Sequence, residues 1–168
     1  MFPRAVLLPA LPVGAPTGEC PVLASVRRRV DVPIAADECI RSLDDARQLR
    51  ALDAADAIVL KVQPLGGVRP ALEIAEVAGV PAIPTSMMET SVGVAAGLAL
   101  AAALPELAYA CGLATVALLV SDVTDDPLVP NAGVLQVRAV VPSPELLDRY
   151  SEVSQDVSSS ASSAGRSR

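Results

Sequence analysis

Lys61 is the residue of this chain with the clearest potential for chemistry. One lysine and twelve arginines make up the 13 basic residues, and that lysine ends the apolar run 57–61 (AIVLK). A charged side chain in such a place either reaches water or points into a partly buried mouth, where desolvation lowers the pKa of a lysine. A lysine of the second kind can act as a base, as an acid or as a cation beside an enolate.

Asp37 and Glu38 form a second candidate, because they close another apolar run, 33–37 (PIAAD). Carboxylate oxygens at a strand end suit Mg²⁺, which prefers oxygen ligands in octahedral geometry. The alternative is structural: one carboxylate faces solvent and the other caps the next helix.

Three further polar stretches are open to two interpretations. The turn at Gly66–Gly67 precedes a predicted helix and either offers backbone N–H groups to an anion or is a plain tight turn. The pairs Thr85–Ser86 and Thr90–Ser91 carry hydroxyl donors for a carboxylate, although polar loops often have this composition. The sequence contains no histidine, which excludes Ser-His-Asp catalysis, histidine metal ligands and histidine acid–base chemistry.

The elements that must position these residues alternate regularly along the chain. Apolar runs predict strands at 33–37, 57–61, 80–85 and 107–111. Helices are predicted between them, from Ser42 as N-cap to residue 52, from residue 68 to a stop at Gly79, and from Ser91 as N-cap to residue 104. A short helical stretch follows at 115–119.

The spacing of the strand ends indicates how the strands pair. Asp37, Lys61 and Thr85 are 24 residues apart, and Cys111–Gly112 follows 26 to 27 residues later. Strand and helix repeated at this period predict an α/β fold whose parallel sheet is built through right-handed crossovers. Since the carboxyl ends of parallel strands carry the chemistry in barrels and open sheets alike, we expect these residues around one mouth.

The chain divides into three predicted parts. Residues 1–20 are an atypical N-terminal segment, 21–150 form one domain, and the Ser-rich tail 151–168 is expected to be disordered. Within the domain, 134–137 is predicted as a short strand, and Ser143–Pro144 starts a last helix that ends near Tyr150. Pro9 and Pro12 interrupt the apolar N-terminal stretch, so we expect a cytoplasmic protein rather than a secreted one.

Charge and composition argue against several classes of partner. The net charge of −6 speaks against nucleic acid, and the arginine cluster 27–29 is interpreted as a solvated helix end. The apolar run 92–104 is too short to cross a membrane. Cys20, Cys39 and Cys111 show no CxxC spacing, which predicts reduced thiols and no zinc site.

Four segments together resemble a known family. They are 32–38 (VPIAADE), 59–67 (VLKVQPLGG), 85–93 (TSMMETSVG) and 109–113 (YACGL). They keep the order and spacing of the second half of the o-succinylbenzoate synthases, in the muconate-lactonizing branch of the enolase superfamily. The resemblance covers roughly residues 22–150 and implies a partial (β/α)₈ barrel of about four C-terminal βα units.

The resemblance also implies roles for individual residues. Asp37 would match the family's third Mg²⁺ ligand, with Glu38 beside it. Lys61 would match the lysine that supports an enediolate as a cation, while a lysine from an earlier strand moves the proton. Ser86 and Gly112 would lie near the succinyl carboxylate. The implied activity is that of a carbon–oxygen lyase, which dehydrates a cyclohexadiene carboxylate to o-succinylbenzoate in menaquinone synthesis, with Mg²⁺ stabilising the enolised carboxylate.

Some features of the family have no counterpart in this sequence. The Lys-x-Lys pair, the capping domain and two further acidic metal ligands are missing, and Val13–Gly14 stands where the preceding strand end would fall. We therefore expect a truncated chain that is inactive alone and that needs a second copy of itself or a complementing N-terminal half.

Three alternatives remain open at this stage. The first is a sister activity, N-acylamino acid racemase or dipeptide epimerase, in which Lys61 would be a true acid–base residue. The second is a non-catalytic fragment or assembly module. The third is some other barrel or a doubly wound α/β protein that binds phosphate at Gly66–Gly67. The absence of a GxGxxG or GxxxxGK motif argues against a nucleotide-binding version of it.

Overall fold

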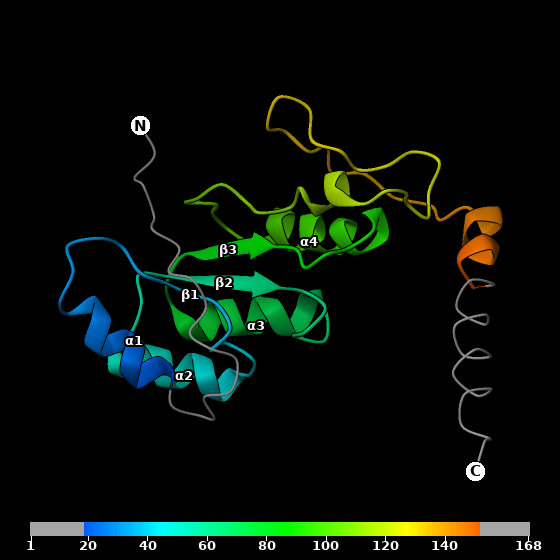
Figure 1. Ribbon diagram of the computed structural model, residues 1–168. Helices are drawn as coiled ribbons and strands as arrows, with labels where there is room; N and C mark the ends of the chain where they lie inside the picture. Colours follow the sequence, from blue (N-terminus) through cyan, green and yellow to red (C-terminus); the bar gives the residue numbers. More distant parts are fainter. Residues whose placement is uncertain (1–18, 152–168) are drawn as a thin grey trace, which may run out of the picture.

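The computed structural model describes residues 19–151 (Figure 1). Predictions for the segment before residue 19, including the strand end at Val13–Gly14, and for the tail beyond residue 151 lie outside the described residues. Four α-helices, three strands and a short 3₁₀ helix follow one another: α1 (Glu19–Arg27), β1 (Ala35–Ala36), α2 (Leu43–Leu52), β2 (Ala57–Lys61), α3 (Val68–Ala78), β3 (Ala82–Thr85), α4 (Ser91–Ala103) and η1 (Thr115–Leu118). Residues 144–151 are helical as well.

The three strands form one parallel sheet in the order β1-β2-β3. Ala36 lies opposite Ile58, and Lys61 lies opposite Thr85. The crossover helices α2 and α3 each return the chain to the same edge, so the carboxyl ends of all three strands point the same way (Figure 1). The predicted parallel arrangement with a common mouth is confirmed for these strands.

Local signals explain where the crossover helices begin and end. The hydroxyl of Ser42 accepts a hydrogen bond from the Asp45 N–H, as predicted for the N-cap of α2. Gly79 ends α3 with a φ of 68°, in the left-handed region that favours glycine. Gly66 and Gly67 also have positive φ, at 82° and 131°, so backbone conformation alone accounts for glycine in this turn.

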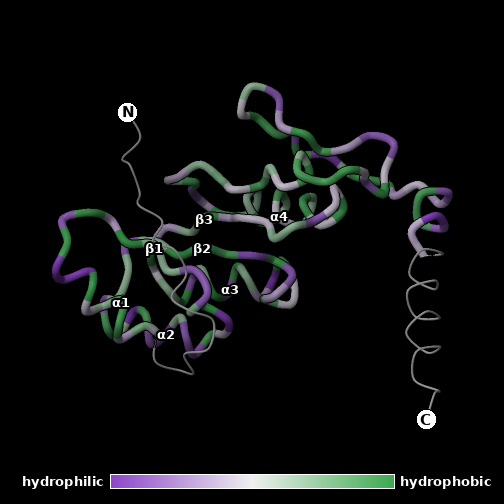
Figure 2. The backbone as a smooth tube through the Cα atoms, in the orientation of Figure 1, coloured by the Kyte–Doolittle hydropathy of each residue, from purple (hydrophilic) through white to green (hydrophobic). Residues whose placement is uncertain are grey.

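The main core lies between one face of the sheet and the helices. Ile58, Leu60 and Ala82 pack there with buried residues of α1, α2 and α3, and Figure 1 shows these helices on one side of the strands. In Figure 2, most of β2 has the colour of hydrophobic residues. Val59 and Ile83 belong to a separate small cluster with Ala35, Ala57 and Tyr109, as expected when successive strand residues face opposite sides.

The predicted strand at 107–111 does not form. A single parallel bridge joins Thr85 to Gly112, in which the Gly112 N–H donates to the Pro84 carbonyl at 3.0 Å. Pro84 has no N–H to donate back to that neighbour, so the ladder loses a bond at the point where it would extend. The fourth strand position of the sheet is therefore reduced to one residue.

Two other predictions need correction, and one helix was not predicted. Residues 134–137 form no strand, because Val134 closes a tight turn with Asn131. The N-cap of α4 is Thr90, while Ser91 is its first residue and completely buried. Helix α1 was not predicted, although its last residue, Arg27, begins the arginine cluster that indicated a helix end.

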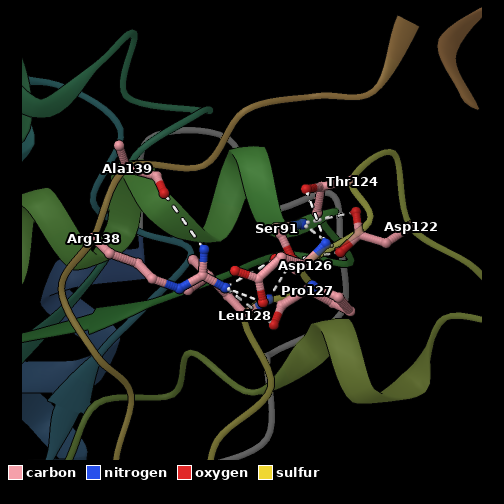
Figure 3. A network of polar contacts seen from close by, with 8 residues as sticks. All are labelled: Ser91, Asp122, Thr124, Asp126, Pro127, Leu128, Arg138 and Ala139. Carbon is pink, nitrogen blue, oxygen red and sulfur yellow. Dashed lines mark hydrogen bonds and ion pairs between the residues drawn. The ribbon is translucent and has the colours of Figure 1, made fainter. Parts of the chain in front are cut away.

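Ser91 fastens the irregular segment after η1 to α4 (Figure 3). Its hydroxyl donates to the Asp122 carboxylate and accepts a hydrogen bond from the Leu128 N–H at 2.7 Å. The Ser91 N–H also donates to Asp122, at 3.1 Å. This segment has few backbone hydrogen bonds of its own, so the buried contacts at Ser91 define its path.

Asp56 ties three elements together just before β2. Its carboxylate accepts from the Arg27 guanidinium at 2.7 Å, at the end of α1, and from the Ile34 N–H at 2.8 Å, ahead of β1. The side-chain hydrogen bond from Arg27 is the main cause that holds the pKa of Asp56 below its usual value, and the Ile34 N–H adds to it.

Along residues 19–151 we find no helix with the length and apolar character that a membrane span requires.

Ser91→Ala is predicted to destabilise the fold by roughly 1–3 kcal/mol, because it leaves the buried Leu128 N–H without an acceptor. Chemical denaturation measures the change in the free energy of unfolding. Ser121→Ala, at an exposed position nearby, is the control and should leave that free energy unchanged. Equal stability of the two variants would contradict the role given to Ser91.

Asp56→Asn is predicted to lower the free energy of unfolding at pH 7 by roughly 1–2 kcal/mol. The lowered pKa of Asp56 stabilises the fold above the unfolded pKa of about 3.9, and this contribution is lost as the pH falls through the folded pKa. Denaturation at pH 7 and at pH 3 should therefore show a gap between wild type and Asp56→Asn that shrinks in acid. A gap of the same size at both pH values would count against this assignment.

Candidate functional site

The carboxyl ends of β1 and β2 bring Asp37, Glu38 and Lys61 together. The Lys61 ammonium forms an ion pair with the Asp37 carboxylate and lies 3.8 Å from Glu38 Oε1. The side chains of Lys61 and Asp37 are 22% and 21% exposed, and that of Glu38 is 47% exposed. The three charged groups thus form a half-buried cluster that solvent and small molecules can reach.

An open pocket of about 370 Å³ lies over this cluster. Its charged lining residues are Asp37, Glu38, Arg41 and Lys61. Its apolar wall includes Leu65 and the two methionines Met87 and Met88 from the loop after β3. A charged group beside an apolar surface suits an organic carboxylate, which brings both a charge and an apolar body.

Ser86 and Gly112 meet beside this pocket. Ser86 directly follows β3, and Gly112 is the residue that the single bridge joins to Thr85. The Ser86 N–H and hydroxyl both donate to the Gly112 carbonyl, at 2.9 and 3.2 Å. The Ser86 hydroxyl is also 2.8 Å from that of Thr115 in η1. Thr115 was missed by sequence reasoning, since only the fold brings it to Ser86.

Thr85 lies between β2 and the single bridge in the sheet register. It is opposite Lys61 on one side and opposite Gly112 on the other. Gly112 leaves room for it, because a Cβ at that position would lie 3.0 Å from Thr85 Cγ2. Among the described residues, Thr85 Oγ1 is the buried side-chain oxygen without a hydrogen-bond partner. Such an atom costs stability unless a ligand or another chain satisfies it.

Cys111 lies next to Gly112 but is a poor candidate for a nucleophile. Burial raises the pKa of its thiol, which keeps the group protonated and unreactive. No disulfide joins Cys20, Cys39 and Cys111, and their redox state stays a prediction.

A larger hollow of about 530 Å³ lies at the other end of the sheet. It is lined by Gly79, Val80 and Leu104, where α3 and α4 end and β3 begins. Its ionisable groups are two glutamates, Glu76 and Glu106. Size alone would favour this hollow, but the lysine, the hydroxyls and the unpartnered oxygen all gather at the carboxyl ends of the strands. The smaller pocket is therefore the better candidate.

The residues at the mouth do not make up a magnesium site by themselves. Within 19–151 no group of three or more His, Cys, Asp or Glu side chains is placed to hold a metal ion. The carboxylates here are Asp37 and Glu38, and the ammonium of Lys61 already engages the first of them. A dication would need further oxygen ligands from elsewhere.

Comparison with known proteins points to one family. Residues 14–142 match the enolase C-terminal domain-like family. A curated relative from Thermobifida fusca (strain YX), an o-succinylbenzoate synthase, is 66% identical over 118 residues. That match covers 70% of this chain but 37% of the relative, so the chain spans little more than a third of the length of the relative.

Solved structures share the fold over most of the chain. The 2-chloromuconate cycloisomerase from Rhodococcus opacus 1CP superposes with a TM-score of 0.72 and 29% identity, covering 78% of this chain and 38% of that one. An N-succinyl Arg/Lys racemase from Bacillus cereus ATCC 14579 gives a TM-score of 0.71 at 24% identity, covering 79% and 37%. The racemase is a likeness of fold alone.

Thr85→Val is predicted to raise the free energy of unfolding by about 1 kcal/mol, because valine keeps the shape and removes a buried hydroxyl that has no partner. The side chain of Thr90 makes no capping hydrogen bond, so Thr90→Val is the matched control and should be nearly neutral. A loss of stability in Thr85→Val would mean that the hydroxyl is satisfied within the chain.

Proposed function

Because this chain belongs to the enolase C-terminal domain-like family, we propose that it supplies the C-terminal part of the catalytic barrel of an o-succinylbenzoate synthase. The reaction would be the dehydration of a cyclohexadiene carboxylate to o-succinylbenzoate, a carbon–oxygen lyase step of menaquinone synthesis. The 66% identity to the T. fusca synthase is the observation that carries this proposal.

The fold supports the same assignment. The chain is part of an enolase-type (β/α)₈ barrel, as predicted, with three strands and the bridge at Gly112 in place of four full strands. In such barrels the substrate binds at the carboxyl ends of the strands. Asp37, Lys61, Ser86 and Gly112 all lie there.

Lys61 is proposed as the cation that stabilises the substrate in its enediolate form. An ammonium in a half-buried mouth interacts more strongly with a developing negative charge than it would in water. The carboxylates of Asp37 and Glu38 fix its position. The proton itself would be moved by a group outside the described residues, since the chain has no second lysine and no histidine.

Ser86 and Gly112 are proposed to receive the succinyl carboxylate. The Ser86 hydroxyl, which donates to the Gly112 carbonyl here, can rotate to donate to a ligand instead. Thr115 lies within hydrogen-bond distance of that hydroxyl and would keep it oriented.

Magnesium and a complementing structure belong to the proposal as well. Asp37 would give one oxygen ligand, with Glu38 beside it, and the other ligands would come from outside residues 19–151. The remaining barrel strands would be supplied by further sequence or by another chain, either a second copy or an N-terminal half. Cytoplasmic localisation fits thiols that remain reduced.

A chimaera tests the proposal directly. The segment of the T. fusca synthase that matches this chain is replaced by the corresponding residues of this chain. At 66% identity we expect the chimaera to fold and to dehydrate the synthase substrate when Mg²⁺ is present. Lys61→Met in the chimaera should lower kcat by at least about 100-fold, the scale on which a stabilising group acts. Arg69→Met, at an exposed site, should not.

Two results would overturn the proposal. One is a chimaera that folds, as judged by circular dichroism, and yet shows no dehydration. The other is equal activity of the Lys61→Met and Arg69→Met chimaeras. Racemisation of N-acylamino acids without dehydration would favour the sister activity, in which Lys61 acts as acid and base.

A further inference from the structure

The loop between β3 and α4 is held by a side chain of its own. Glu89 places one carboxylate oxygen, Oε1, 3.0 Å from the Met87 N–H, which donates to it. The other oxygen, Oε2, accepts a hydrogen bond from Gln63 Nε2 at 2.7 Å. One carboxylate therefore folds the loop back on itself and joins it to the segment after β2.

Gln63 extends this connection to a third element. Its amide nitrogen also donates to the Gly93 carbonyl, in the first turn of α4, at 3.2 Å. The amide has two N–H donors, and this arrangement uses both. The segment after β2, the loop after β3 and the start of α4 are thus fastened at one point.

Gly93 lies close to the hydrogen bond between Gln63 and Glu89. A Cβ at this position would lie 2.7 Å from Glu89 Oε2 and 2.9 Å from Gln63 Nε2, closer than carbon atoms approach such groups. Glycine within a helix costs roughly 0.5–1 kcal/mol relative to alanine, so helix propensity does not account for it. The glycine leaves room for the Gln63–Glu89 hydrogen bond, because the ends of both side chains would have to shift to admit a Cβ.

The loop fixed in this way carries the apolar wall of the candidate site. Met87 and Met88 are 50% and 63% exposed, and both line the pocket that holds Asp37 and Lys61. Gln63, Glu89 and Gly93 do not line it. Unbranched methionine side chains adapt to the shape of an apolar ligand, but only if their backbone holds them over the pocket.

We propose that Gln63, Glu89 and Gly93 form a clamp that holds Met87 and Met88 as the apolar wall facing Lys61. The three are positioning residues for the site. This inference rests on the proposed function for the identity of the ligand, a carboxylate with an apolar ring, and not for the clamp itself.

The clamp is tested on the folded protein labelled with [methyl-¹³C]methionine. The sequence has three methionines, so three methyl signals are expected. In Gln63→Ala and in Gly93→Ala the signals of Met87 and Met88 should move toward the shift of a freely rotating methionine. Gln136→Ala, at an exposed position, is the control and should move none of them.

Unchanged Met87 and Met88 signals in a folded Gln63→Ala protein would overturn the clamp. Gln63 is exposed, so this variant should keep its fold, which circular dichroism can verify. Gly93→Ala gives an independent result, since it leaves both hydrogen-bonding side chains present and removes only their space.

A second readout separates the clamp from the proposed function. o-Succinylbenzoate is titrated into the T. fusca chimaera with Mg²⁺ present, and the clamp variants should weaken its binding by about tenfold. If the unsubstituted chimaera does not bind it, the proposed function fails, while the methyl signals still decide the clamp. If chimaeras with and without Gln63→Ala bind it equally well, the clamp does not position this site.

Discussion

The parallel register between β2 and β3 is the constraint on which the rest of the site depends. It places Lys61 directly opposite Thr85, and the bridge continues the same row to Gly112. Side chains that are 24 residues apart in sequence become neighbours because each crossover helix returns the chain to the same edge. Lys61 also forms an ion pair with Asp37, which follows β1, although the register between β1 and β2 places Ala36 opposite Ile58 and so does not put Asp37 directly opposite Lys61. A shift of register by one residue would turn Lys61 to the other face of the sheet.

Much of the sheet and of its crossover helices can be predicted from the sequence, because the local signals agree with the fold. Ser42 begins α2 and Gly79 ends α3 through contacts within a few residues. The strands at 57–61 and 80–85 are apolar up to their last residues, Lys61 and Thr85. The strand at 107–111 failed for a reason outside its own residues: Pro84, on the neighbouring strand, lacks the N–H that would pair with it. The composition of residues 107–111 does not show whether the neighbouring strand has an N–H to donate to them.

The candidate site, like the fold, can be predicted from the sequence only in part. The residue spacing predicts that Asp37, Lys61 and Ser86 lie at one mouth, and the structure places them at the ends of adjacent strands. The hydrogen bonds that orient them depend on three-dimensional contacts between distant segments. Ser86 meets Thr115 across 29 residues, and Gln63 meets Glu89 across 26. Neither partner carries a local signal of its role, although Gly93, an unexplained glycine in a helix, indicates that something must pass close by.

We propose that this mouth receives a carboxylate beside Lys61. A crystal structure of the T. fusca chimaera soaked with o-succinylbenzoate and magnesium chloride would show where that ligand binds. We expect the ligand to lie between Lys61 and the wall formed by Met87 and Met88, with one carboxylate at Ser86. Electron density for the ligand in the larger hollow between the ends of α3 and α4, with none near Lys61, would contradict it.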